Sequence, residues 1–373
     1  MKILYIGNYA DGTGWGNAAL HNIIAMNRCG IDVVPRRVSY SQNEVEIPAE
    51  VMALEQKDLT GIDAYVQHTL PTDFIYSTYN KVKPICMFET ENVSFRNSTW
   101  AKYINMFENI WIPNKIMKDH IWYSGVDKVG KKIHCVPHCI DTDIYKNFQS
   151  VEQNIFPEKS YNFCFVGEMN KRKNISAIIK AFHLAFHPAE NVNLFFKLSG
   201  GGFSSNDDGL KFFYSLHDQI TSSMKIRKKY KSPYVMFGRL AQESLLSYMS
   251  QCHCFVSASY GEAWCIPALE AMALGLDLIY TEKTGLSQFA CPETSSACQS
   301  REVACFDALD TLPELSSSRD TWMEIDISDL ASLMRKHYEL RNFTDRTKTI
   351  ASAMEFNYEN TGMAIRRSLD DIL

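Results

Sequence analysis

The chain has 373 residues, of which 46% are hydrophobic and 22% are charged, and its formal net charge at pH 7 is -5. One hydrophobic core rarely accommodates this length, so we expect two domains. The small negative charge excludes a global attraction to nucleic acid or anionic membranes. No apolar run reaches the roughly 20 residues that span a bilayer, and the start MKILYIGNYADG indicates a first strand rather than a signal peptide. The eleven cysteines show no framework spacing and favour free thiols in the cytoplasm.

Short apolar runs of strand length alternate with helical patterns along most of the chain. The first series is KILYIGN, GIDVVP, DAYVQH, KPICMFE, NIWIPN and KIHCVPH, and the second is YNFCFVGE, VNLFFKLSG, PYVMFGR, CHCFVSAS and LDLIYT. Such runs predict buried parallel strands, and hence an α/β protein with two sheets divided near residues 146–160. The end YENTGMAIRRSLDDIL predicts an amphipathic helix with the apolar residues Met363, Ile365, Leu369 and Ile372.

A glycine-rich loop follows the first predicted strand. Its glycines, Gly12, Gly14 and Gly16, precede a helical pattern, so backbone and helix N-terminus can approach an anionic ligand. The spacing differs from the dinucleotide-binding pattern, and Arg36 and Arg37 stand where an NAD site needs an acid. Arginines can bind the 2′-phosphate of NADP, so an NADP-dependent oxidoreductase stays open, as does a turn without a ligand.

A second strand, loop and helix lies in YNFCFVGEMNKRKNISAIIKAF. The loop contains Lys171, Arg172 and Lys173, and Asn174 is a candidate cap for the helix that follows. Cations at the carboxyl end of a parallel strand, beside a helix N-terminus, suit a diphosphate. A solvated run of charges is the alternative.

The segment SYGEAWCIPALEAMALG, residues 259–275, contains two glutamates separated by seven residues. Glu262 falls in a loop, and Glu270 falls about one turn inside a helix that Pro267 begins and Gly275 ends. Three backbone N–H groups near the positive end of this helix can face an anion: those of Trp264, Cys265 and Ile266. Carboxylates repel phosphate but bind hydroxyl groups, so the pair fits a sugar nucleotide, with one acid for the sugar and one for the ribose. Two solvated acids on a surface loop are the alternative.

These motifs together resemble those of the group 1, family 4 retaining glycosyltransferases, which have the GT-B fold. The glutamate segment is similar to their S-x-x-E-G-F-G-x-P-x-x-E-A-M-A-x-G signature. VGEMNKRKN is similar to V-G-R-x-x-x-x-K-G/N, VPHCIDTDIY to V-P-N-G-V-D-x-x-x-F, and FGRLAQESLLSYMSQCHCFVSAS to G-x-x-x-x-x-E-L-x-x-x-Y. With the first glycine loop, these are ordered matches over most of the chain, which is more specific than any single motif.

The resemblance implies two Rossmann-like domains that face an interdomain cleft. Residues 1–150 would form the acceptor domain, 151–350 the nucleotide-sugar donor domain, and 351–373 a helix packed back on the first domain. The implied enzyme transfers a hexosyl or pentosyl group from a nucleotide-diphosphate sugar, with retention, to a hydroxyl of a glycan, a lipid-linked glycan or a modified nucleobase of DNA. No cofactor or metal is expected, because a lysine, backbone amides and a helix dipole supply the positive potential. A binding protein without turnover and a weak membrane-surface contact stay open.

The resemblance also assigns roles to single residues. Glu262 would bind the hydroxyls of the transferred sugar, Lys173 would neutralise the leaving diphosphate, and Glu270 would bind the ribose. The other expected donor-binding residues are Trp264, Cys265, Ile266, Arg172, Lys197, Arg239 and Leu240. On the acceptor side, the expected residues are Gly14, Trp15, Gly16, His68 and Glu89.

Some features depart from the family pattern or point elsewhere. Glu168 occupies the place of a phosphate-binding arginine, and Ala263 and Cys265 replace two glycines, which narrows the permitted backbone angles. HCVPHC, residues 134–139, contains two histidines and two cysteines, which are the residue types that bind zinc. Strand alternation places these side chains on different faces, so we expect no metal. The basic run KIRKKYK, residues 225–231, predicts a solvated helix face, with anionic lipid or nucleic acid as the alternative partner.

Overall fold

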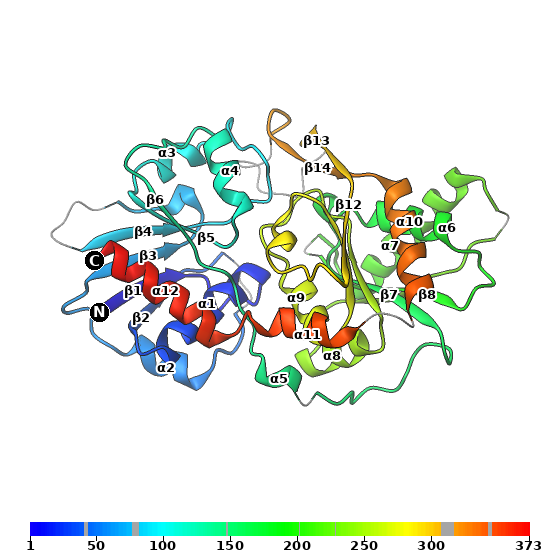
Figure 1. Cartoon of the computed structure of the whole chain (residues 1–373), viewed down its shortest axis with the longest axis horizontal. Coiled ribbons are helices and arrows are strands. Elements are labelled where there is room, and N and C mark those ends of the chain that lie inside the picture. Colours follow the sequence, from blue (N-terminus) through cyan, green and yellow to red (C-terminus); the bar gives the residue numbers. More distant parts are fainter. Residues whose placement is uncertain are drawn as a thin grey trace.

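The computed structural model describes residues 1–40, 44–76, 82–146, 148–200, 202–227, 229–306, 317–341 and 345–373. These residues form two α/β lobes that lie side by side, the first coloured blue to cyan and the second green to orange in Figure 1.

The first lobe is built on a six-stranded sheet with the strand order β2-β1-β3-β4-β5-β6, and all of its pairs are parallel. The strands are β1 (Lys2–Gly7), β2 (Asp32–Arg37), β3 (Ala64–His68), β4 (Lys83–Met87), β5 (Asn109–Ile112) and β6 (Lys132–Cys135). The helices between them are α1 (Gly14–Arg28), α2 (Ala49–Glu55), α3 (Trp100–Ile104) and α4 (Ile116–Tyr123). Each apolar run of the first predicted series is therefore confirmed as a strand.

The second lobe contains a six-stranded parallel sheet with the order β12-β11-β10-β7-β8-β9. Its strands are β7 (Tyr161–Glu168), β8 (Val192–Ser199), β9 (Tyr234–Phe237), β10 (Cys254–Ser257), β11 (Asp277–Thr281) and β12 (Ser295–Cys298). Its helices are α6 (Ile175–Ala185), α7 (Asn206–Met224), α8 (Gln242–Ser250), α9 (Ile266–Ala273), α10 (Ile327–Leu340) and α11 (Arg346–Met354). The second predicted series corresponds to β7 to β11. Sequence patterns missed β12 and the antiparallel pair β13 (Ser300–Ala304) and β14 (Thr321–Ile325).

The central strands are apolar without alternation because helices cover both faces of each sheet. In β7, every residue from Tyr161 to Val166 is buried, and Phe163 and Phe165 are among the largest fully buried side chains. The core of the second lobe joins β7, β8, β10 and β11 to α6 and α9. This packing fixes the carboxyl ends of the strands, where the loops with the predicted chemistry begin.

The chain passes between the lobes twice. Helix α5 (Asp143–Lys146) lies in the first passage, and the second leads from α11 to α12 (Tyr358–Ile372), the red helix that lies on the first lobe in Figure 1. There α12 packs on α1, and a Cβ atom at Gly362 would come within 2.3 Å of Cys29 Sγ.

The buried face of α12 includes Ile365, Leu369 and Ile372, as predicted. The prediction was wrong for Met363, which is 42% exposed. Gly362 and Ser368 also lie on the buried face. At Gly362 the helix approaches α1 too closely for a side chain, and Ser368 Oγ accepts a hydrogen bond from Trp111 Nε1 at 2.7 Å.

All eleven cysteines are free thiols, as predicted. In the parts of the chain that the structure describes, no helix combines the length and apolarity needed to cross a membrane.

Candidate active site

The predicted functional residues gather where the carboxyl ends of the two sheets meet. In the second lobe, the loops that follow β7 and β10 contain the cations and the first glutamate. In the first lobe, His68 ends β3 and Glu89 follows β4. Open parallel sheets bind ligands at this edge, because the loops and helix N-termini converge there.

Glu262 is buried between two cations. Its Oε1 atom lies 2.5 Å from Lys173 Nζ, its Oε2 atom lies 3.2 Å from Arg172 Nη1, and Ser259 Oγ donates to Oε1 at 2.7 Å. Burial alone would raise the pKa of Glu262, but the charges of Lys173 and Arg172 outweigh it and lower this pKa to about 2. Glu262 is therefore a carboxylate at neutral pH, suited to accept hydrogen bonds from hydroxyl groups.

Helix α9 begins next to this carboxylate. Cys265 caps it in the left-handed conformation (φ 79°, ψ 72°), Pro267 lies in its first turn, and Gly275 follows its end with φ +83°. In the described part of the chain, no hydrogen bond uses the backbone N–H groups of Trp264, Cys265 or Ile266. These groups are the orphan donors of a helix start and can bind an anion. Burial, assisted by Glu262, raises the pKa of the Cys265 thiol to about 12, so this thiol is not a nucleophile.

Glu270 lies inside α9, as predicted, and is contacted by the passage between the lobes. The Tyr145 hydroxyl, from α5, donates to Glu270 Oε1 at 3.1 Å. Burial raises the pKa of Glu270 to about 7, while hydrogen bonds from Tyr145 and Gln242 act in the opposite direction. Tyr145 ends the matched segment VPHCIDTDIY, but sequence reasoning did not predict its contact with Glu270, because nothing local relates it to a residue 125 positions away.

The remaining donor-side candidates follow the neighbouring strands β8 and β9. Lys197 is half-buried in β8, and burial, with the charge of Arg239, lowers its pKa. Arg239 and Leu240 are exposed after β9, behind Gly238 at φ +104°. The candidates thus run along one sheet edge in the strand order β10, β7, β8, β9.

The turn after β7 differs from its prediction in one detail. Asn174 adopts φ 50°, and its side chain caps no helix; instead, Asn170 Oδ1 accepts from the backbone N–H of Lys173 at 3.1 Å. This contact orients the turn that presents Lys173. Glu168 is exposed and accepts a hydrogen bond from Asn170 at 3.1 Å.

The acceptor-side candidates form a second cluster. Trp15 Nε1 donates to His68 Nε2 at 2.8 Å, and His68 Nδ1 lies 2.8 Å from the Tyr5 hydroxyl. Glu89 Oε1 lies 3.0 Å from His68 Nε2 and 2.8 Å from His138 Nε2. An indole nitrogen can only donate, so His68 Nε2 accepts from Trp15, and we assign the proton of His68 to Nδ1. The hydrogen bond to Glu89 is then donated by His138 Nε2. Burial lowers the pKa of His68, which agrees with a neutral ring.

The first glycine loop is shorter than predicted. Helix α1 begins at Gly14, and Thr13 caps it by accepting from the backbone N–H of Gly16 at 3.0 Å. A Cβ atom at Gly16 would come within 2.8 Å of the Asn8 carbonyl oxygen, so this glycine serves a close approach. Trp15 lies between Gly14 and Gly16 in the first turn of α1, and its side chain reaches His68.

Direct contacts join the two clusters. The rings of His138 and Trp264 lie 5.5 Å apart, and Arg172 Nη2 lies 3.3 Å from Glu91 Oε1. A Cβ atom at Gly261 would come within 1.8 Å of the Glu91 carbonyl oxygen, so the two loops touch through their backbones. Sequence reasoning placed His138 in the matched segment VPHCIDTDIY but gave it no role in this site, although its place three residues after β6 put it at the same sheet edge.

The structure gives little support to the two alternative ligands, NADP at Arg36 and Arg37 and a metal ion at residues 134–139. Arg36 donates to the carbonyl oxygens of Glu55 and Lys57 at 2.8 Å, and Arg37 pairs with the Glu55 carboxylate at 2.8 Å, so both guanidinium groups are engaged by protein. No group of three or more histidine, cysteine, aspartate or glutamate side chains among the described residues is arranged to hold a metal ion. His134 faces Asp371, at 3.6 Å, rather than His138.

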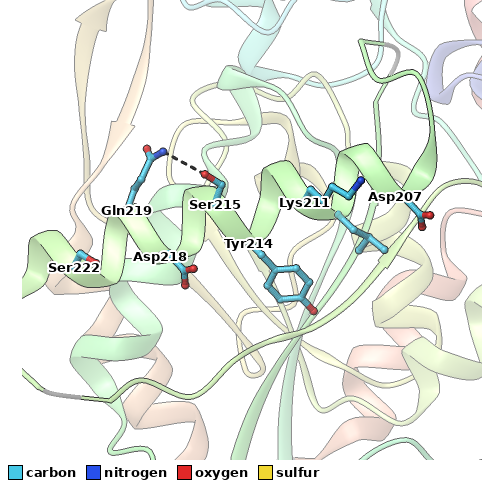
Figure 2. A pocket seen from close by; sticks show the side chains of 8 residues that line it. Asp207, Lys211, Tyr214, Ser215, Asp218, Gln219 and Ser222 are labelled. Carbon is cyan, nitrogen blue, oxygen red and sulfur yellow. Dashed lines mark hydrogen bonds between the residues drawn. The ribbon is translucent and has the colours of Figure 1, made fainter.

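The described residues of the basic run, 225–227 and 229–231, do not form a helix face. Helix α7 ends at Met224, Arg227 donates to the Phe186 carbonyl oxygen, and Lys231 donates to the Val192 carbonyl oxygen at 2.9 Å. The prediction of a solvated helix face was therefore wrong for these residues, while Lys228 lies outside the described residues. Figure 2 shows a shallow hollow lined by side chains of α7 alone, and it contains none of the predicted site residues.

We compared the chain with known protein families and solved structures. A sequence model of the family "Glycosyl transferases group 1" matches residues 147–297, which include the cationic turn and the glutamate segment. No curated protein sequence matches the chain.

Solved structures show the architecture. Sucrose-phosphate synthase from Thermosynechococcus elongatus superposes with a TM-score of 0.67 at 15% identity, over 100% of this chain and 98% of that one. The chain has the GT-B fold. HepE from Anabaena, in complex with UDP and glucose, gives a TM-score of 0.63 at 13% identity over 100% of both chains. The UDP-forming α,α-trehalose-phosphate synthase from Burkholderia xenovorans, in complex with glucose-6-phosphate, gives 0.67 at 9% identity over 99% of this chain and 100% of that one.

Proposed function

We propose that the protein is a retaining glycosyltransferase that moves a sugar from a nucleotide-diphosphate sugar to an acceptor hydroxyl. The observation that carries this proposal is the buried carboxylate of Glu262, paired with Lys173 and Arg172 beside the unused N–H groups that begin α9. An anion-binding surface and a hydroxyl-binding carboxylate in direct contact match the two halves of a nucleotide sugar. The family match of this segment supports the proposal.

Each part of the donor has a counterpart in the site. Lys173, Arg172 and the backbone amides would face the diphosphate, Glu262 the sugar hydroxyls, and Glu270 the ribose. Lys173 contacts Glu262. A diphosphate bound to Lys173 would therefore place the attached sugar close to the Glu262 carboxylate. The same positive groups would stabilise the charge that develops on the leaving diphosphate, and its oxygen would take the acceptor proton, so no metal is required.

The acceptor would approach from the first lobe. Trp15, His68 and Glu89 lie at its sheet edge, and the loops of the two lobes touch there. We therefore assign residues 1–150 to acceptor binding and 151–350 to donor binding, with 351–373 tying the second lobe to the first. Two of the similar solved structures contain UDP and glucose, or glucose-6-phosphate, which makes UDP-glucose the first donor to test.

An NMR-monitored panel of UDP-glucose, UDP-N-acetylglucosamine, GDP-mannose and ADP-glucose tests this proposal. We expect the protein to consume one of these donors, without added metal and in the presence of a chelator, and to release a product with the donor's anomeric configuration. Lys173→Ala should lower turnover about 10² to 10³-fold, whereas the same change at the exposed neighbour Lys171 should have a far smaller effect.

Other outcomes favour other functions. Binding of a nucleotide sugar without hydrolysis or transfer would indicate a binding protein. Stabilisation of the protein by NADPH, and by no nucleotide sugar, would indicate an oxidoreductase. An inverted product would contradict the retaining mechanism.

A further inference from the structure

Two buried polar groups at the contact between the lobes are unsatisfied. Within the described residues, neither Trp264 Nε1 nor His138 Nδ1 has a hydrogen-bond partner. Trp264 is 2% exposed and His138 is 1% exposed, and their rings meet edge to face at 5.5 Å and 71°. Buried polar groups are rarely left unpaired, because each then loses its bond to water without replacement.

The chemical roles of these two atoms are fixed by their surroundings. The indole nitrogen of Trp264 can only donate. On the other ring, His138 Nε2 lies 2.8 Å from the carboxylate of Glu89, which holds the proton of His138 on Nε2. A carboxylate can only accept, so Glu89 accepts the hydrogen bond from His138 Nε2. In the neutral imidazole, whose one proton lies on Nε2, the free atom Nδ1 is an acceptor.

A donor and an acceptor in neighbouring rings call for a group that does both. A hydroxyl oxygen can accept the indole N–H and donate its own hydrogen to the imidazole nitrogen. A carbonyl or phosphate oxygen can satisfy only the indole, and an ammonium group only the imidazole. We propose that His138 and Trp264 form a subsite for a single hydroxyl of a sugar substrate, with Glu89 as the residue that positions His138.

The place of this hydroxyl subsite ties it to the transfer reaction, and the inference rests on the proposed function. Trp264 stands two residues after Glu262 and leads into α9, while His138 belongs to the loop after β6 in the first lobe. Each lobe thus contributes one residue to the subsite, which is complete only while the lobes are in contact. The hydroxyl can belong to the transferred sugar or to the acceptor sugar, since both are recognised by the same chemistry.

A double-mutant cycle tests the subsite. Trp264→Phe removes the N–H but keeps a ring against Phe289 and Phe356, and His138→Ala removes the acceptor. His134→Ala is the matched control, because His134 lies in the same segment but faces Asp371. For each variant and for the double variant, calorimetry gives the Kd of UDP and of the nucleotide sugar that wild type consumes, and kinetics give the KM of the acceptor.

The expected result is non-additive. Each single change should weaken the sugar-dependent step about tenfold, and the double variant should be no weaker than the worse single variant, because both rings bind one hydroxyl. The Kd of UDP should not change, and neither should any constant of His134→Ala. A loss in the Kd of the nucleotide sugar assigns the hydroxyl to the transferred sugar, and a loss confined to the acceptor KM assigns it to the acceptor.

Three results would overturn the subsite: no loss in either step, a roughly hundredfold loss in the double variant that marks two independent effects, or an equal loss of UDP binding. If His138→Ala lowers the melting temperature, His138→Gln replaces it, because glutamine keeps a donor for Glu89. Failure of wild type to bind any nucleotide sugar is a separate outcome, which removes the proposed function and the subsite with it.

Discussion

The Tyr145 hydroxyl donates a hydrogen bond of 3.1 Å to Glu270, although the two residues stand 125 positions apart. Tyr145 lies in α5, in the passage between the lobes, and Glu270 lies in α9 of the second lobe. The carboxylate proposed to bind the ribose is thus held by the segment that connects the lobes. This hydrogen bond opposes the rise that burial causes in the pKa of Glu270.

Replacement of Tyr145 by phenylalanine should shift the pH dependence of donor binding. Burial raises the pKa of Glu270 to about 7, and the bond from Tyr145 opposes this rise, so its loss should raise the pKa further. The ribose hydroxyls prefer the ionised carboxylate, so wild-type affinity should fall as pH falls through about 7, and the midpoint should lie higher in Tyr145→Phe. Calorimetric Kd values from about pH 5.5 to about pH 9 provide the measurement.

Tyr248→Phe is the control for this shift, since the hydroxyl of Tyr248 bonds to Glu152 instead, at 3.2 Å. The role given to Tyr145 is wrong if both variants keep the wild-type midpoint.

A buried histidine pair should make the second lobe sensitive to acid. His183 Nε2 lies 3.1 Å from His217 Nε2, and His183 is 1% exposed. Burial, with the charges of His217 and Arg227, lowers the pKa of His183 to about 4, below the usual histidine value of 6.5. The unfolded chain therefore binds a proton more readily, and the free energy of unfolding should decrease as pH falls from about 6.5 to about 4.

Urea unfolding at about pH 7 and about pH 5 measures this decrease in the free energy of unfolding. Over the whole range from about pH 6.5 to about pH 4, His183→Gln should make the decrease smaller by about 1 to 3 kcal/mol. The exposed His187, just after the same helix, is the control position for the same change. An unchanged pH dependence in His183→Gln would assign the acid sensitivity to other groups.

Gly362→Ala should loosen the contact of α12 with α1. The new Cβ atom would come within 2.3 Å of Cys29 Sγ and 2.6 Å of the Ala25 carbonyl oxygen, and a backbone atom cannot move as a side chain does. We expect a loss of about 1 to 3 kcal/mol in the free energy of unfolding. Met363→Ala, at an exposed position of the same helix, should cost far less, and equal effects of the two changes would show that the close approach is not a constraint.

The sequence predicted the strands of both sheets well, because strands buried on both faces leave continuous apolar runs such as NFCFV and DLIYT. It did not predict β12 or β13, whose residues are mostly polar or only partly buried. It also did not predict β14, although Trp322, Met323 and Ile325 are buried there. Nor did it predict that Met363 is exposed, since the close contact at Gly362 depends on a partner helix more than 300 positions earlier.

The cations, the glutamates and the helix start that we propose to bind the donor were also visible in the sequence, because they are local motifs. The structure brings Lys173, Arg172 and Glu262 together and leaves Arg239 and Leu240 exposed. The partners Tyr145 and His138 come from distant segments, and a contact over 49 positions between Glu89 and His138 leaves no periodic signal. Long-range polar contacts are the part of this site that only the fold reveals.

The affinity of the donor for Glu270→Ala tests the central claim most directly. Calorimetry would compare UDP with 2′-deoxy-UDP on wild type, on Glu270→Ala, and on Glu243→Ala, an exposed glutamate of α8. If Glu270 binds the ribose hydroxyls, wild type and Glu243→Ala bind UDP more tightly than the deoxy analogue, and Glu270→Ala loses about 1.5 to 3 kcal/mol of UDP binding together with this discrimination. If Glu270→Ala binds UDP with wild-type affinity and still distinguishes the two nucleotides, the nucleotide does not bind in the site described.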